Sequence, residues 1–264
     1  MKRLADRSSK LNTALCSAKL PGGLRNLCIV GLVISTSVIT GCNNATQSIP
    51  ESSYFPLNEG LEWQYSTIKR TDEGVTRGEY LIGSTGITTD FEESLLTRID
   101  GYGTRFYFRA DESGIYRLGK QNLISRDIQY DAKPRYVLPS PVTIGKSWFA
   151  DSHPYVLQRL YPVRETFTRQ NVFQMSYSVL DTAAQIEVPA GRYENCIHVR
   201  GTGTATVLAD LVKGRYGASD AEIITDEWYA LGVGLVKLVR TEVFPNELFA
   251  DGTYTMELIR FGGS

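Results

Sequence analysis

The sequence has no apolar run long enough to cross a bilayer comfortably. Its charge-free apolar stretch, Leu27 to Ile39, is short, whereas a membrane helix needs about 20 apolar residues. The preceding stretch, Met1 to Asn26, carries six Lys/Arg against one acidic residue, Asp6. A positive flank, a short apolar core and small residues at its end are typical of a secretory signal. We therefore expect residues 1–41 to be a signal peptide.

The apolar stretch ends in Ile39-Thr40-Gly41-Cys42. This resembles the bacterial lipobox, in which the cysteine sulfur receives diacylglycerol and the cysteine becomes the new N-terminus. The resemblance implies a lipid on Cys42, and two or three acyl chains hold a protein stably at a membrane. Asn43 and Asn44 differ from the Asp-type signal for inner-membrane retention in enteric bacteria. The resemblance thus implies an outer-membrane lipoprotein with its domain in the periplasm. A plain signal peptide, or a buried helix that ends in Cys, is the alternative.

Cysteine is scarce beyond this leader. Two of the four cysteines fall within residues 1–41 and Cys42 is the expected lipid site, so only Cys196 remains. A monomer therefore has no internal disulfide, although the periplasm would permit one. The stability of the domain must come from its core.

Basic charge is also scarce. The leader takes six of the 28 Lys/Arg and one of the 29 Asp/Glu, which leaves 22 basic and 28 acidic residues and a net charge of about −6. This argues against nucleic acid as a partner, because such proteins present a basic face. It argues equally against a polybasic membrane patch.

Motifs for catalysis, metals and cofactors are missing. The sequence contains no Gly-x-Ser-x-Gly and no His-Glu-x-x-His, and Gly201 to Ala205 lacks the third Gly and the Lys of a phosphate loop. Cys196 and His198 share a face of a predicted strand and could form a nucleophilic pair, but Cys also behaves as a small buried hydrophobe. With His153 as the only other histidine, no metal site or cofactor is expected.

From Tyr54 onward the sequence has the composition of a β protein, with frequent aromatics and glycines and no long 3.6-residue apolar stripe. Ala110 to Gly114 is a hairpin signal, because Asp starts turns and Gly takes positive φ. Residues 42–53 are expected to be a polar tether and residues 54–264 a single β domain. The expected fold is all-β, a mostly antiparallel, strongly curved sheet or half-barrel with at most one or two short helices.

Three segments between the predicted strands are expected to interrupt the sheet. The Pro-rich segment Lys133 to Pro141 cannot be the middle of a sheet and is interpreted as a crossover. Arg192 to Asn195 is interpreted as a helical turn, and Asp210 to Asp220 as a polar loop.

Tyrosine and arginine alternate between residues 98 and 130. Cross-strand packing and cation–π contacts account for such a face. The same residue types are favoured at interfaces, so an interaction surface is the alternative. The residues proposed for it are Arg105, Tyr107, Arg109, Tyr116 and Arg117.

Three further segments resemble signatures of β-rich, often lipidated bacterial exported proteins of unknown function, whose sheets are similar to the half-open barrels of periplasmic lipoprotein carriers. These segments are Tyr54-Phe55-Pro56-Leu57-x-x-Gly60-x-x-Trp63-x-Tyr65, Val188-Pro189-Ala190-Gly191-x-Tyr193-x-Asn195-Cys196-Ile197-x-Val199 and Trp228-Tyr229-Ala230-x-Gly232-Val233-Gly234-x-Val236-Lys237. Physically they indicate scaffold: buried aromatics after an entry turn, and glycines at bends.

Three functions remain open from the sequence. The favoured one is a membrane-anchored, non-enzymatic envelope module that contacts or assembles another envelope protein. The second is a carrier that binds lipid or another apolar ligand in its curved sheet. The third is a thiol enzyme that uses Cys196 and His198.

Overall fold

The computed structural model describes residues 53–88, 94–125, 127–159, 172–212, 215–244 and 249–263. All of them belong to one compact unit, Thr46–Ser264. The predicted signal peptide, Cys42 and all of the predicted tether except Ser53 lie outside the described residues.

The described residues form strands and no helix, which confirms the all-β prediction. Twelve of the strands form one antiparallel sheet, and β8 pairs with β13 separately. No helix among the described residues is long and apolar enough to cross a membrane. The strands are β1 (Leu61–Thr71), β2 (Gly74–Thr88), β3 (Leu95–Asp100), β4 (Arg105–Asp111), β5 (Gly114–Gln121), β6 (Gln129–Pro139), β7 (Ser147–Ser152), β8 (Gln158–Arg159), β9 (Phe173–Val188), β10 (Gly191–Val212), β11 (Arg215–Ala230), β12 (Gly234–Val243), β13 (Phe249–Ala250) and β14 (Gly252–Gly263).

The sheet order is β6-β5-β4-β3-β2-β1-β14-β12-β11-β10-β9-β7. Consecutive strands mostly pair as hairpins, and the predicted turn is one of them: Asp111 lies opposite Gly114, whose φ is 128°. The last strand, β14, lies between β1 and β12. It therefore joins the first half of the sheet, β1 to β6, to the second half, which consists of β7 and β9 to β12.

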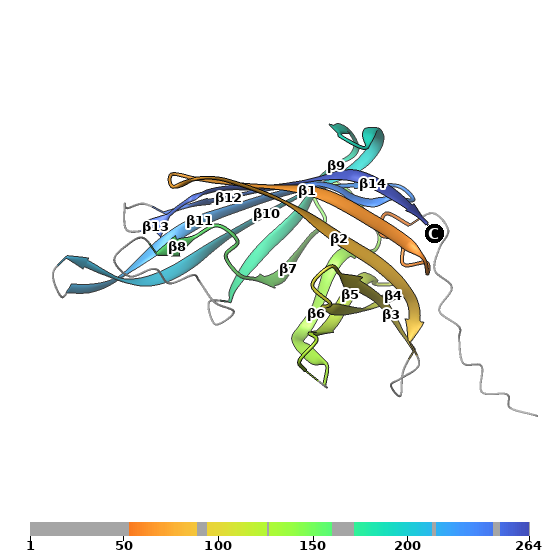
Figure 1. Cartoon of the computed structure of the whole chain (residues 1–264), viewed down its shortest axis with the longest axis horizontal. Helices are drawn as coiled ribbons and strands as arrows, with labels where there is room; N and C mark the ends of the chain where they lie inside the picture. Colours follow the sequence, from red (N-terminus) through yellow and green to blue (C-terminus); the bar gives the residue numbers. More distant parts are fainter. Residues whose placement is uncertain are drawn as a thin grey trace, which may run out of the picture. The chain divides into compact units, whose positions relative to one another are not determined.

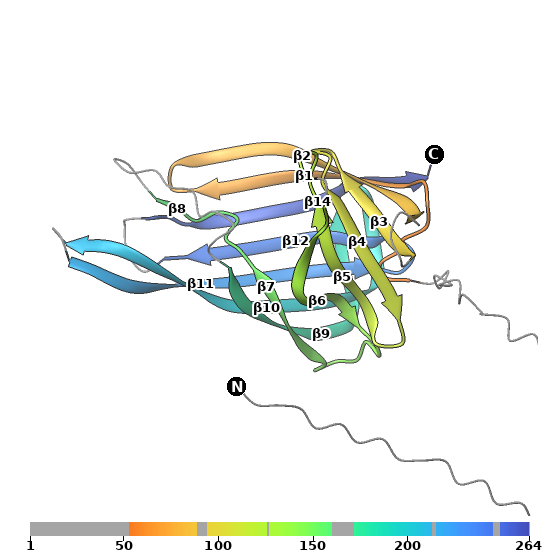
Figure 2. The ribbon, with the colours of Figure 1, turned by 90° about the horizontal axis from the view of Figure 1, so that it is seen from below.

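The sheet is strongly curved, as predicted. Register shifts occur at many strand pairs, and such bulges bend strands and increase their twist. Strands β3 to β6 turn beneath the layer formed by β1, β14, β12, β11 and β10 (Figures 1 and 2). The two edge strands then meet, since Arg135 Nε on β6 donates to the carbonyl of Asp151 on β7 at 3.1 Å. The curved sheet therefore surrounds an interior.

The main core fills part of this interior and contains side chains from both halves. Phe108 and Leu138 of the first half cluster with Tyr177, Val199 and Ile223 of the second. Burial of each such side chain contributes about 1.5–3 kcal/mol to folding. A second cluster contains Trp63, Tyr65, Cys196 and Leu258. The prediction that the signature aromatics Trp63 and Tyr65 are buried is confirmed, with exposures of 1% and 3%.

The three signature segments act as scaffold because they bond to one another. Trp63 Nε1 donates to the carbonyl of Val233 at 2.6 Å, and the Tyr65 hydroxyl donates to Leu235 O at 2.8 Å. Tyr54 donates to the carbonyl of Asn195 at 3.2 Å. These long-range bonds join residues that lie more than 140 positions apart in the sequence.

Three local predictions were wrong. The segment from Lys133 to Pro139 is part of strand β6, and only the residues after Pro139 cross over. Pro134 is tolerated there because β6 is an edge strand, where a missing N–H breaks no ladder. Arg192 to Asn195 belongs to β10, bulged where Asn195 has φ 53°. The segment Asp210 to Asp220 is mostly the hairpin end of β10 and β11.

Candidate functional site

The interior of the curved sheet contains an unfilled pocket of about 230 Å³. Most of its wall is aromatic or aliphatic, and strands from both halves contribute to it. The rings and thioether that define this aromatic pocket include Tyr65, Phe108, Trp148, Tyr177, Tyr229 and Met256. Trp148 stacks on Tyr177 with 5.7 Å between ring centroids. The wall is therefore largely aromatic and apolar, with two of its rings stacked on each other.

A second hollow of about 430 Å³ adjoins the aromatic pocket and is polar. Both are lined by Tyr80, Phe106, Arg117, Arg135 and Tyr155, so these side chains form their common boundary. The residues that line only the polar hollow are Asp100, Thr104, Lys120, Asp151 and His153. Together the two hollows offer an apolar region next to a charged one.

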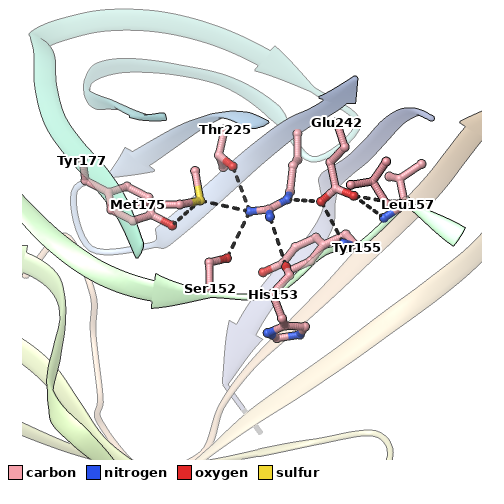
Figure 3. A network of polar contacts seen from close by, with 10 residues as sticks. Ser152, His153, Tyr155, Leu157, Met175, Tyr177, Thr225 and Glu242 are labelled. Atoms are coloured by element: carbon pink, nitrogen blue, oxygen red, sulfur yellow. Dashed lines mark hydrogen bonds and ion pairs between the residues drawn. The ribbon is translucent and has the colours of Figure 1, made fainter. Parts of the chain in front are cut away.

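The segment from His153 to Leu157, here called the strap, follows β7 and carries the boundary residue Tyr155. It is pinned by Glu242 of β12. The carboxylate accepts the backbone N–H groups of Tyr155, Val156 and Leu157 at 2.8, 2.8 and 2.9 Å (Figure 3). The strap has no strand partner over these residues, so Glu242 supplies the acceptors that a sheet would provide.

Glu242 is paired with Arg240, and both are buried, with exposures of 0% and 1%. Arg240 Nε donates to Glu242 Oε1 at 2.6 Å, and the other guanidinium nitrogens contact Thr225 Oγ1 and the carbonyl of His153 (Figure 3). The guanidinium also lies 4.2 Å from the ring centroid of Tyr155. The pair therefore fixes both the backbone of the strap and the ring that lines the pocket.

Arg98 on β3 is a buried cation in the wall of the aromatic pocket. Its guanidinium lies 3.7 Å from the ring centroid of Phe55 and 4.1 Å from that of Trp63. One nitrogen donates to the carbonyl of Pro56 at 2.5 Å. Burial lowers the pKa of Arg98 to about 10, so the group stays charged at neutral pH.

Three cations, Arg117, Lys120 and Arg135, line the polar hollow, together with two carboxylates. Burial, together with Lys120, Arg240, Arg135 and Arg117, lowers the pKa of His153 from 6.5 to about 4. The imidazole is thus neutral at pH 7.

The low pKa of His153 predicts a loss of stability in acid. The imidazole of His153 binds a proton less readily in the folded protein than in the unfolded chain. The free energy of unfolding is therefore unaffected by this group above pH 6.5 and decreases as the pH falls from 6.5 to about 4. In His153→Asn the free energy of unfolding should fall by about 1 kcal/mol less between pH 7 and pH 4 than in the wild type. The effect is this small because the ring is partly exposed and solvent screens its charge. Urea unfolding at pH 7 and pH 4 measures it. An equal decline in both proteins would contradict the assignment.

Cys196 and His198 do not form a nucleophilic pair. Cys196 is fully buried, and burial raises the pKa of its thiol to about 11. His198 instead contacts Asp226 Oδ1 at 2.8 Å and stacks on Trp228, with ring centroids 4.6 Å apart. The geometry that a thiol enzyme would need at these two residues is absent. No group of three or more His, Cys, Asp or Glu that could hold a metal occurs in the part of the chain that the structure describes.

The proposed Arg/Tyr surface is not one exposed face. Tyr107 and Tyr116 are buried, and their hydroxyls donate to the side chains of Gln121 and Asp111. Arg105 and Arg109 are half-buried. Arg117 points to the interior, where it lines both hollows.

Sequence reasoning missed most of the site. Arg98 was placed only in the Arg/Tyr-rich face. Arg135, Tyr155, Arg240 and Glu242 were not proposed. The available signal was in β12, where Arg240 and Glu242 continue the same alternating face as the apolar residues before them. A pair of opposite charges on a buried face indicates a buried ion pair.

Comparison with known proteins finds no matching family model and no significant match among curated proteins. Two solved structures are similar. One is a candidate lipoprotein from Parabacteroides distasonis ATCC 8503, with 15% identity and a TM-score of 0.40. The other is a candidate exported protein with a YmcC-like fold from Bacteroides fragilis NCTC 9343, with 12% identity and a TM-score of 0.39. Each comparison covers 80% of this chain and 99% of the other chain. Similarity this low carries no argument about function.

Proposed function

We propose that this protein is a non-enzymatic envelope lipoprotein, anchored to the outer membrane through Cys42, that carries an apolar ligand inside its curved sheet. The observation that supports this is the aromatic pocket. Small-molecule sites are concave and mostly apolar, with a few polar groups that orient the ligand. A sheet that served only as scaffold would fill this space with its own side chains, as packed interiors do.

A second candidate is the interaction or assembly module, and a pair of turns favours it. Tyr102, Leu123 and Ile124 are exposed by 74%, 78% and 95% in the β3–β4 and β5–β6 turns. The two turns touch, since a side chain at Gly103 would meet Leu123. Apolar residues gathered at loop tips are typical of contact surfaces.

Mass spectrometry of what co-purifies with the natively isolated protein separates the two candidates. A stoichiometric apolar small molecule would support the carrier. An empty protein that arrives with a protein partner would support the interaction module and contradict the carrier.

The anchor predicts a separate result. Cys42→Ala should abolish metabolic labelling with an acyl chain, because the thioether requires the sulfur. Persistent labelling of this variant would show that the lipid is not attached at Cys42. A variant with Cys196→Ala is the matched control, and it should be labelled like the wild type.

A further inference from the structure

Two buried N–H donors in the aromatic pocket lack acceptors. Among the described residues, the buried side-chain polar atoms without a hydrogen-bond partner are Arg98 Nε and Trp148 Nε1. Both residues line the same pocket. Buried donors are nearly always paired in folded proteins, and each unpaired one is costly. Their shared location indicates that the pocket is built to receive a group with acceptor atoms.

The charges around the pocket indicate that this group is an anion. Three guanidinium groups line it, those of Arg98, Arg117 and Arg135, against one carboxyl group, that of Glu227. Arg117 is already bound by both oxygens of Asp131 at 2.7 Å, and Glu227 accepts the hydroxyl of Tyr229. Arg98 has no ion pair among the described residues, although only 3% of it is exposed.

The aromatic neighbours of Arg98 and the plane of its guanidinium set the direction from which an anion binds. Phe55 and Trp63 cover the guanidinium at 3.7 and 4.1 Å from their ring centroids. An acceptor must therefore come in the plane of the guanidinium, where its N–H bonds point. Carboxylates and phosphates bind guanidinium groups in this plane.

We infer that the ligand is an amphiphile whose anionic group, a carboxylate or a phosphate, binds Arg98 inside the pocket while its apolar body lies against the aromatic walls. This inference rests on the proposed carrier function and adds the chemical class of the ligand. Trp148 supplies a second donor to acceptor atoms of the same ligand.

Binding of matched probes tests the inference. Decanoate, decyl phosphate and the neutral decanol share one apolar chain, and titration calorimetry of the purified protein at pH 8 measures each. We expect at least one anion to bind about tenfold more tightly than decanol, since a charge-assisted hydrogen bond is worth this factor. The anion that binds more tightly shows whether the head group of the ligand is a carboxylate or a phosphate. Equal binding of all three would overturn the inference and leave the carrier standing. Binding of none would overturn the carrier itself.

Variants locate the anion. Arg98→Gln should remove the preference for the anion and leave the affinity for decanol nearly unchanged. Trp148→Phe keeps the aromatic ring but removes the unpaired donor, so it should weaken anion binding less and still fold. Arg77→Gln, at an exposed arginine on β2, is the control for a lost positive charge and should bind like the wild type. An unchanged preference in both Arg98→Gln and Trp148→Phe would place the anion elsewhere and overturn the assignment. If Arg98→Gln fails to fold, Trp148→Phe and the probe series still decide the question.

Discussion

Glu242→Gln is expected to lower the free energy of unfolding by about 3–5 kcal/mol, the usual cost of removing one partner from a buried ion pair. The carboxylate accepts four hydrogen bonds, three from the backbone of the strap and one from Arg240. An amide replaces one acceptor oxygen with a donor, so at least one strap N–H faces another donor. Arg240 is then left buried without its counter-charge. Urea denaturation at pH 7 measures the difference.

The matched control for this variant is Glu257→Gln in the neighbouring strand β14. Glu257 pairs with Lys237 at 2.7 Å, but both side chains are about a quarter exposed. Solvent-exposed pairs contribute little, so this change should cost less than about 1 kcal/mol. If the two variants lose similar amounts of unfolding free energy, burial does not determine how much the Arg240–Glu242 pair stabilises the protein. A loss below 1 kcal/mol for Glu242→Gln would contradict the role of this carboxylate in anchoring the strap.

The local structure of the first half was predictable because its causes are local. The first signature segment predicted that Trp63 and Tyr65 are buried, and Asp111 with Gly114 predicted a hairpin. Curvature followed from the fold resemblance. Each of these inferences needed only neighbouring residues or a shared pattern.

The arrangement of the strands was not predictable from such patterns. Strand β14 inserts between β1 and β12, and the partners in β1 and β14 lie nearly 200 positions apart along the chain. No turn signal marks a pairing of this kind. The Pro-rich segment was misplaced for a related reason: Pro134 excludes the middle of a sheet but does not exclude its edge.

The candidate site was missed because it consists of charges inside the sheet. An Arg or Glu in a strand normally faces solvent. The alternation in β12 is a signal for Arg240 and Glu242, whereas only the tertiary structure shows that Arg98 is buried. Arg117 was proposed, but for an outer surface. Its side chain belongs to the interior because Asp131 on the edge strand β6 holds it there.

Val137→Trp is expected to weaken ligand binding at least tenfold while the protein remains folded. Val137 is half-buried on β6 and lines the aromatic pocket. An indole at this position would occupy the space that the carrier proposal assigns to the ligand. Because the new ring enters an existing hollow, the free energy of unfolding should change by less than about 1.5 kcal/mol, whereas overpacking a filled core costs more. Titration with the neutral fluorescent probe N-phenyl-1-naphthylamine measures the affinity.

The control is Val75→Trp, at an exposed valine on β2 that lies outside the pocket. It adds the same ring and should bind the probe like the wild type. If Val137→Trp unfolds, Val137→Phe adds a smaller ring at the same place and should still lower the affinity. Unchanged binding by a folded Val137 variant would mean that the ligand lies outside the aromatic pocket. Loss of binding in the Val137 variants alone would place the ligand between the two halves of the sheet, where the strap and Arg98 both reach it.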